Sequence, residues 1–87
     1  MEDLSYEKKV SVFTEGIEAC DENGTPITNL AGLADYLNLD HNVAIGAKRA
    51  GVVEGNCREG YSLTVDPETA AERTIEATRN YYRDRTK

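Results

Sequence analysis

A chain of 87 residues that is 39% hydrophobic and 30% charged can form one small domain, whose core is too small to bury many unpaired polar groups. Ten Lys and Arg against sixteen Asp and Glu give a net charge of −6, which opposes a polyanionic partner and favours a basic one. No apolar run approaches the length of a membrane span, and the first residues lack the basic and apolar blocks of a signal peptide. We therefore expect a cytoplasmic protein that does not enter a membrane.

Residues 1–24 carry most of the acidic excess, with a net charge of −5, and two strand-like runs. Residues 1–7 are expected to fray, because nothing in them demands burial. The β-branched residues over 8–14 alternate as in a strand, and Ile17 and Ala19 share one face of a second strand, so we predict a small N-terminal β-hairpin. A helix is the alternative, because apolar residues also recur at helical spacing: Tyr6, Val10, Phe13 and Ile17.

Two short helices are predicted over residues 29–50. Apolar side chains recur there at steps of three and four, after Asn29 as the N-cap: Leu30, Leu33, Ala34 and Leu37. Asn38-Leu39-Asp40 then breaks the pattern with turn-forming side chains around one buried anchor, and Asp40 can cap the second helix. Helices joined by so short a turn indicate a helix-turn-helix.

A β-hairpin is predicted after the helix-turn-helix. Val52-Val53 and the run 61–65 are strand-like and flank a polar, Gly-rich loop over 54–60. Their place beside the two helices is much like that of a wing.

A long helix is predicted at the C-terminus, over residues 66–87. Asp66 can cap it, and Pro67 fits its first position. Glu residues lie in its early half and Arg residues near its end, which complements the helix dipole. Its apolar stripe is thin, so we expect the last turn to be loosely held. The whole chain, 1–87, is thus predicted to be a single α+β domain.

A family resemblance rests on short motifs between residues 17 and 65. They are Asp21-Glu22-Asn23-Gly24 followed by Ile27, then Leu30-Ala31-Gly32-Leu33-Ala34-Asp35-Tyr36-Leu37-Asn38-Leu39-Asp40-His41, and finally Arg58-Glu59-Gly60-Tyr61. Together they resemble the NUMOD1, or intron-encoded nuclease repeat type, module, a small DNA-binding repeat at the ends of homing endonucleases. The resemblance implies a strand and an Asn-Gly-like turn before a helix-turn-helix, with a closing Arg-x-Gly-Tyr segment.

The resemblance also implies that the second helix of the turn motif enters a DNA groove. With Arg58 on the wing, the side chains presented to DNA would be His41, Asn42, Ile45, Lys48 and Arg49. Asn can read adenine, and Arg or Lys can read guanine or bind phosphate.

The second helix departs from the family pattern at two positions. Ala44 and Lys48 stand where the pattern has bulky aliphatic residues. Either the helix is rotated on the core, or this part of the alignment is wrong. A rotated helix would use Val43, Ala47 and Ala50.

Catalysis has little support in the sequence. We find no Gly-rich phosphate loop, no nucleophile paired with a histidine, and no cluster of metal-ligating residues. Cys20 and Cys57 stand alone, without a CxxC pattern, and are expected as reduced structural thiols. A bridge between them would need a geometry that the sequence does not show. We therefore expect no catalytic residue, no cofactor and no metal, and a protein that is not an enzyme.

The charge balance favours a small regulator of transcription that binds a basic protein, such as an RNA polymerase subunit or a nucleoid protein. Its acidic surface would consist of Glu15, Glu18, Asp21 and Glu22. A second protein contact would come from the C-terminal helix, through Arg79, Tyr81, Tyr82 and Arg83. The alternative is a sequence-specific helix-turn-helix regulator that binds duplex DNA through His41, Asn42, Lys48, Arg49 and Arg58.

Overall fold

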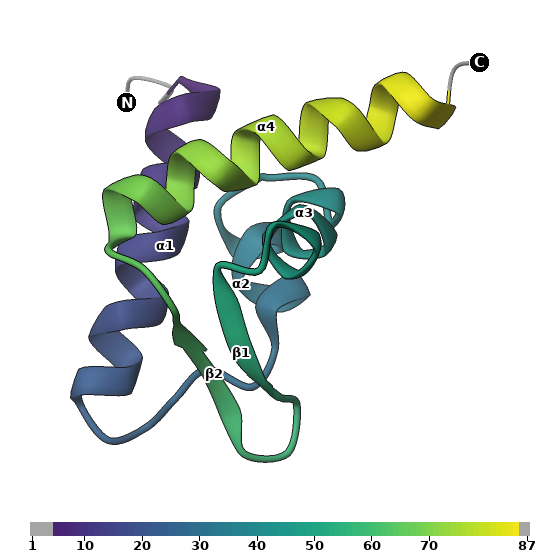
Figure 1. Cartoon of the computed structure of the whole chain (residues 1–87). Coiled ribbons are helices and arrows are strands. Elements are labelled where there is room, and N and C mark those ends of the chain that lie inside the picture. Colours follow the sequence, from purple (N-terminus) through teal and green to yellow (C-terminus); the bar gives the residue numbers. More distant parts are fainter. Residues whose placement is uncertain (1–4, 86–87) are drawn as a thin grey trace.

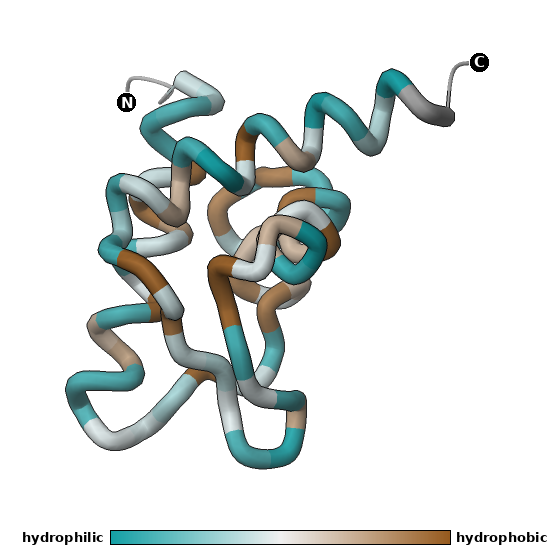
Figure 2. Tube along the Cα trace, in the orientation of Figure 1, coloured by the Kyte–Doolittle hydropathy of each residue, from teal (hydrophilic) through white to brown (hydrophobic). Residues whose placement is uncertain are grey.

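The computed structural model describes residues 5–85 as a mixed α+β fold with four helices and a two-stranded antiparallel hairpin, whose tip projects away from α3 and α4 (Figure 1). In chain order the elements are α1 (Tyr6–Glu22), α2 (Leu30–Tyr36), α3 (Asn42–Ala50), β1 (Val53–Asn56), β2 (Gly60–Leu63) and α4 (Pro67–Arg85). The predicted α+β class, the hairpin after α3 and the C-terminal helix are confirmed. The tip of the hairpin is mostly hydrophilic, whereas hydrophobic segments gather where the helices meet (Figure 2).

The predicted N-terminal β-hairpin is wrong, because this segment forms the helix α1. Val10, Phe13 and Ile17 are fully buried at helical spacing, so one face of α1 meets the core. Burial of these side chains outweighs the preference of β-branched residues for strands. Gly16 is tolerated within the helix and lies against Leu33 of α2.

Helix α1 begins inside the stretch that was expected to fray. The hydroxyl of Ser5 accepts a hydrogen bond from the backbone N–H of Lys8 and caps the helix. Tyr6 and Glu7 consequently form its first turn, while residues 1–4 lie outside the described residues.

Helices α2 and α3 follow one another across the turn 37–41, as expected for a helix-turn-helix. Asn29 caps α2 by accepting the N–H of Gly32. The chain leaves α2 at Asn38, which has a left-handed backbone conformation (φ +58°). The backbone N–H of Leu39 then donates a hydrogen bond to the carbonyl of Ala34 at 2.8 Å. Leu39 is buried beneath the turn, as predicted.

The hairpin is joined to the segment before α2 by a further antiparallel bridge. Tyr61 of β2 pairs with Ile27, and its backbone N–H donates to the Ile27 carbonyl at 2.8 Å. Gly60 lies directly on Pro26, where a Cβ would collide with the proline ring. Since Gly60 also has a left-handed φ of +102°, this position requires glycine. In chain order, a helix, a single bridge, the two helices joined by a turn and the hairpin follow one another.

Helix α4 closes the core from one side and makes its most extensive contacts with α3 and α1. It crosses both helices, and its C-terminal turns extend past α3 (Figure 1). The α3 crossing is close because it uses small residues: Gly46 meets Thr78 and lies near Thr74. Both threonines are buried, and their hydroxyls donate to carbonyls one turn earlier in α4.

A search of the described residues for a helix with the length and apolar character needed to cross a membrane found none.

Candidate functional site

Helix α3 turns one small surface outward, here called the α3 outer face and defined as Ile45, Lys48 and Arg49. All three side chains are exposed. The opposite side of α3 is buried and consists of Val43, Ala44, Gly46 and Ala47. Val43 and Ala47, two of the residues named for a helix rotated relative to the family pattern, lie on this buried side, and the third, Ala50, is half-buried.

The α3 outer face lies between the hairpin and α4. On one side, Nζ of Lys48 lies 5.4 Å from the ring centre of Tyr61 in β2. On the other side, Cζ of Arg49 lies 4.9 Å from the ring centre of Tyr81 in α4. Ile45, one turn earlier, falls between these two cations around the helix. Both cations thus rest on aromatic rings, which restricts where their charged groups lie.

The first turn of α3 is tied to α4. Oδ1 of Asp40 accepts the backbone N–H of Asn42 at 2.9 Å, and Nδ2 of Asn42 donates to the hydroxyl of Tyr82 at 3.0 Å. The backbone hydrogen bond from Asn42, together with a hydrogen bond from Tyr82, lowers the pKa of Asp40. The side-chain amide of Asn42, which was expected to contact DNA, therefore donates to Tyr82 of α4.

His41 precedes α3 at the exposed end of the turn. Its Nε2 lies 3.8 Å from Oδ1 of Asp35, and both side chains are largely exposed. An acidic neighbour at this distance opposes a phosphate contact by His41.

Arg58 lies at the tip of the hairpin. Asn56 holds this tip, because its side-chain oxygen accepts the backbone N–H groups of Arg58 at 2.9 Å and Glu59 at 2.8 Å. Arg58, Glu59 and Glu54 are all exposed, so the tip carries both signs of charge.

The predicted acidic residues lie on α1 rather than on strands. Glu15, Glu18 and Glu22 share one side of this helix, whereas Oδ1 of Asp21 accepts a hydrogen bond from the Ser62 hydroxyl of β2 at 3.0 Å. Asp21 is thus turned toward the hairpin and separated from the other three.

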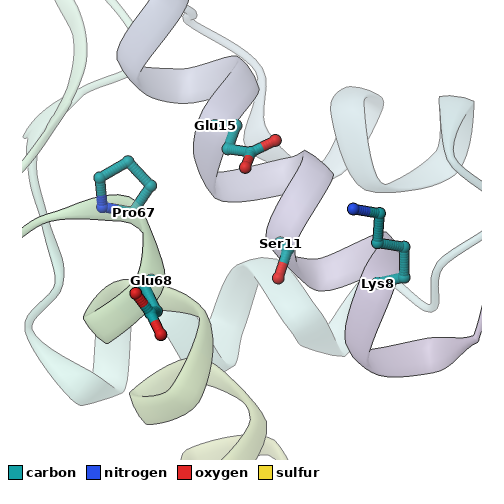
Figure 3. A pocket seen from close by; sticks show the side chains of 5 residues that line it. All are labelled: Lys8, Ser11, Glu15, Pro67 and Glu68. Atoms are coloured by element: carbon teal, nitrogen blue, oxygen red, sulfur yellow. The ribbon is translucent and has the colours of Figure 1, made fainter.

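The acidic side of α1 continues onto the start of α4. Partial burial raises the pKa of Glu18, and so do the charge and hydrogen bond of Glu22 and the charge of Asp66. Glu15 and Glu68 line a hollow between the two helices, together with Lys8, Ser11 and Pro67 (Figure 3). We call Glu15, Glu18, Glu22, Asp66 and Glu68 the α1–α4 acidic surface.

The residues predicted as a second protein contact do not form one surface. Tyr81 and Tyr82 meet edge to face, with ring centres 6.0 Å apart, and both contact side chains of α3. Arg79 instead faces α1, where its guanidinium lies 3.5 Å from the carboxylate of Glu7. Arg83 donates to the side chain of Asn80 within α4. The contacts of the two tyrosines with α3 were missed from the sequence.

The thiols and metal-ligating residues add no site of their own in residues 5–85. Cys20 is partly buried and Cys57 is exposed at the hairpin tip, and both are free. A search of this part of the chain for three or more His, Cys, Asp or Glu side chains able to hold one metal ion found none.

Comparisons of this chain with protein-family models, with curated proteins and with solved structures found no match.

Proposed function

We propose that this protein is a small, non-catalytic regulator that binds duplex DNA by placing the α3 outer face in the major groove. The observation that carries the proposal is the position of this face, outward between the hairpin and α4, with Lys48 and Arg49 on it. Helix α3 itself contains no acidic residue. The major groove of B-DNA admits an α-helix, and a helix that follows a helix-turn-helix turn is well placed to enter it.

The carboxylates of the α1–α4 acidic surface lie away from α3, whereas Asp35 and Asp40 precede α3 and Glu54 and Glu59 lie on the hairpin. The acidic half of α1 and the start of α4 lie across the molecule from α3 (Figure 1). Charges separated by more than a Debye length of about 8 Å are largely screened at physiological salt. Repulsion between the α1–α4 acidic surface and DNA bound at α3 is therefore weak.

Few cations lie near α3, so we expect phosphate contacts to supply only a small part of the affinity for DNA. Lys48, Arg49 and Arg58 would neutralise about three phosphates at most, giving a slope of log affinity against log salt of roughly −2.7. Much of the affinity must then come from base contacts. Arg49 can donate two hydrogen bonds to guanine, and its position over Tyr81 holds the guanidinium in place.

The test is DNA binding measured by fluorescence anisotropy at several salt concentrations, using duplexes selected from a random-sequence pool. We expect Lys48→Ala to weaken binding and to reduce the salt slope by roughly 1. Lys8→Ala is the matched control, because it removes the same charge from the hollow between α1 and α4. The proposal is wrong if no duplex binds at low salt, or if both substitutions have the same effect.

A second candidate function is binding of a basic protein, such as an RNA polymerase subunit or a nucleoid protein, through the α1–α4 acidic surface. The observation that favours it is the grouping of Glu15, Glu18 and Glu22 on one side of α1, next to the start of α4. Partial burial and the neighbouring charges of Glu22 and Asp66 raise the pKa of Glu18. A cationic partner would relieve this repulsion between like charges.

Its test compares two pairs of substitutions for binding to purified RNA polymerase. Glu18→Gln with Glu22→Gln should weaken capture several-fold, whereas Glu72→Gln with Glu76→Gln makes the same charge change on the exposed side of α4 and should not. Equal effects of the two pairs would show that only net charge matters and would exclude this surface.

For either function, we propose that the protein acts in the cytoplasm, without catalysis and without a cofactor.

A further inference from the structure

An aliphatic side chain stands at the centre of the α3 outer face. Ile45 is 39% exposed, whereas three other aliphatic residues of α3 point inward: Val43 is fully buried, Ala44 is 4% exposed and Ala47 is fully buried. Ala50, at the end of α3, is half-buried. Lys48 and Arg49 lie one turn further along, on either side of Ile45. An exposed apolar side chain thus lies between two cations on the outer side of α3.

We infer that Ile45 reads the 5-methyl group of a thymine in the major groove, an inference that rests on the proposed function. The thymine methyl is the apolar group that base edges present in this groove, and an aliphatic side chain has no hydrogen-bonding group with which to read another edge. Ile is also stiff at χ1 in a helix, so its methyl groups are held in one position before DNA binds.

The spacing along α3 sets the sequence expected around this thymine. Arg49 follows Ile45 by four residues, which is an axial rise of about 6 Å. Base pairs are stacked about 3.4 Å apart. A guanine read by Arg49 would therefore lie one or two base steps from the thymine read by Ile45. Duplexes selected by the protein should contain a thymine and a guanine at this separation.

The test removes a single methyl group from the DNA. A duplex selected from a random pool is prepared as a series in which each thymine in turn is replaced by deoxyuridine, which pairs identically. The wild-type protein should lose about fourfold in affinity at one or two positions, which corresponds to one buried methyl-sized group. Ile45→Ala should bind the thymine and uracil duplexes equally. Lys8→Ala, in the hollow between α1 and α4, is the control and should retain the wild-type ratio.

The outcomes separate this inference from the proposed function. If the wild type binds a selected duplex but shows no uracil effect at any position, Ile45 does not read thymine and the DNA-binding proposal stands. The same holds if Ile45→Ala keeps the wild-type ratio of thymine to uracil affinity. If the wild type binds no duplex at low salt, both proposals fail. The exposure of Ile45 makes a folding defect in Ile45→Ala small, and the unfolding midpoint of the variant checks this.

Discussion

The hydroxyl of Tyr82 in α4 accepts a hydrogen bond from Nδ2 of Asn42, the first residue of α3, at 3.0 Å. The same tyrosine helps to lower the pKa of Asp40, whose carboxylate accepts the backbone N–H of Asn42. The hydrogen bond between Asn42 and Tyr82 holds the beginning of α3 against a part of α4 that lies 40 positions later in the chain. The orientation of the α3 outer face therefore depends on α4.

Removing the Tyr82 hydroxyl should destabilise the fold modestly. We expect Tyr82→Phe to lower the free energy of unfolding by about 1 kcal/mol, because it deletes hydrogen bonds and keeps the ring. Asn42→Ala should have a similar effect, and the double variant should lose less than the sum of the two. Urea unfolding measures all three.

Tyr36→Phe is the control for this cycle. Tyr36 is 84% exposed, so loss of its hydroxyl should leave the free energy of unfolding unchanged. Additive effects of Tyr82→Phe and Asn42→Ala would contradict the hydrogen bond between them.

Two glycines within helices should respond in opposite directions to alanine. A Cβ at Gly46 would collide with Oγ1 of Thr78 and lie 3.2 Å from the Thr74 carbonyl, so Gly46→Ala should cost about 1–3 kcal/mol by forcing α3 and α4 apart. A Cβ at Gly16 would meet Leu33 at an ordinary 3.6 Å, so Gly16→Ala should stabilise α1 by about 0.5–1 kcal/mol. Thermal unfolding midpoints of the two variants test this. A shift of the same sign in both midpoints would be inconsistent with the close crossing of α3 and α4.

The buried hydroxyl of Thr14 joins α1 to the start of α4. It lies 2.9 Å from the Pro67 carbonyl and 3.0 Å from the Ser11 carbonyl. Thr14→Val keeps the volume and removes the donor, so we expect a loss of about 1–2 kcal/mol. Thr14→Ser keeps the donor and loses one methyl, at a cost of about 1 kcal/mol. Their urea midpoints test this hydrogen bond, which would be unimportant if Thr14→Val were as stable as the wild type.

The free energy of unfolding should depend on pH through the capping carboxylate of Asp66 and through Glu18. Hydrogen bonds from Thr69 lower the pKa of Asp66, so its contribution to stability is present above about pH 4 and is lost as the pH falls through its folded pKa. Glu18 has a raised pKa, so its contribution is present below about pH 4.3 and is lost as the pH rises through its folded pKa.

Two conservative substitutions separate these effects in unfolding midpoints measured from pH 3 to pH 6. Asp66→Asn should flatten the acid side of the curve, and Glu18→Gln should remove the decline above about pH 4.3. Curves of the same shape as the wild type in both variants would rule out these two carboxylates as the source of the pH dependence.

Local signals were sufficient for much of this fold. Asn29 before the Leu-rich run located α2, and Asp66 before Pro67 located the start of α4. For α1 the local signals conflicted, since β-branched residues favoured a strand and the spacing of Val10, Phe13 and Ile17 also fitted a helix. Contact with α4, a segment far away in the sequence, decides between them, and no local pattern contains that information.

Only the part of the candidate site that lies on a single helix could be predicted from local sequence signals. Lys48 and Arg49 were identified from the sequence because they are neighbours on one helix. The rings beneath them, Tyr61 and Tyr81, come from other elements and were missed. A stripe of small residues repeating every four positions, Ala70, Thr74 and Thr78, was the available signal that α4 would lie close to another helix.

The position of α4 in the chain also affects folding during synthesis. The core faces of α1 and α3 are made first, yet the helix that covers them is translated only afterwards, as the 53-residue separation of Thr14 and Pro67 illustrates. A nascent chain that has not yet exposed residues 67–78 outside the ribosome must leave Val10, Phe13 and Val43 open to water. The core formed by residues 5–85 is therefore completed only after α4 has left the ribosome.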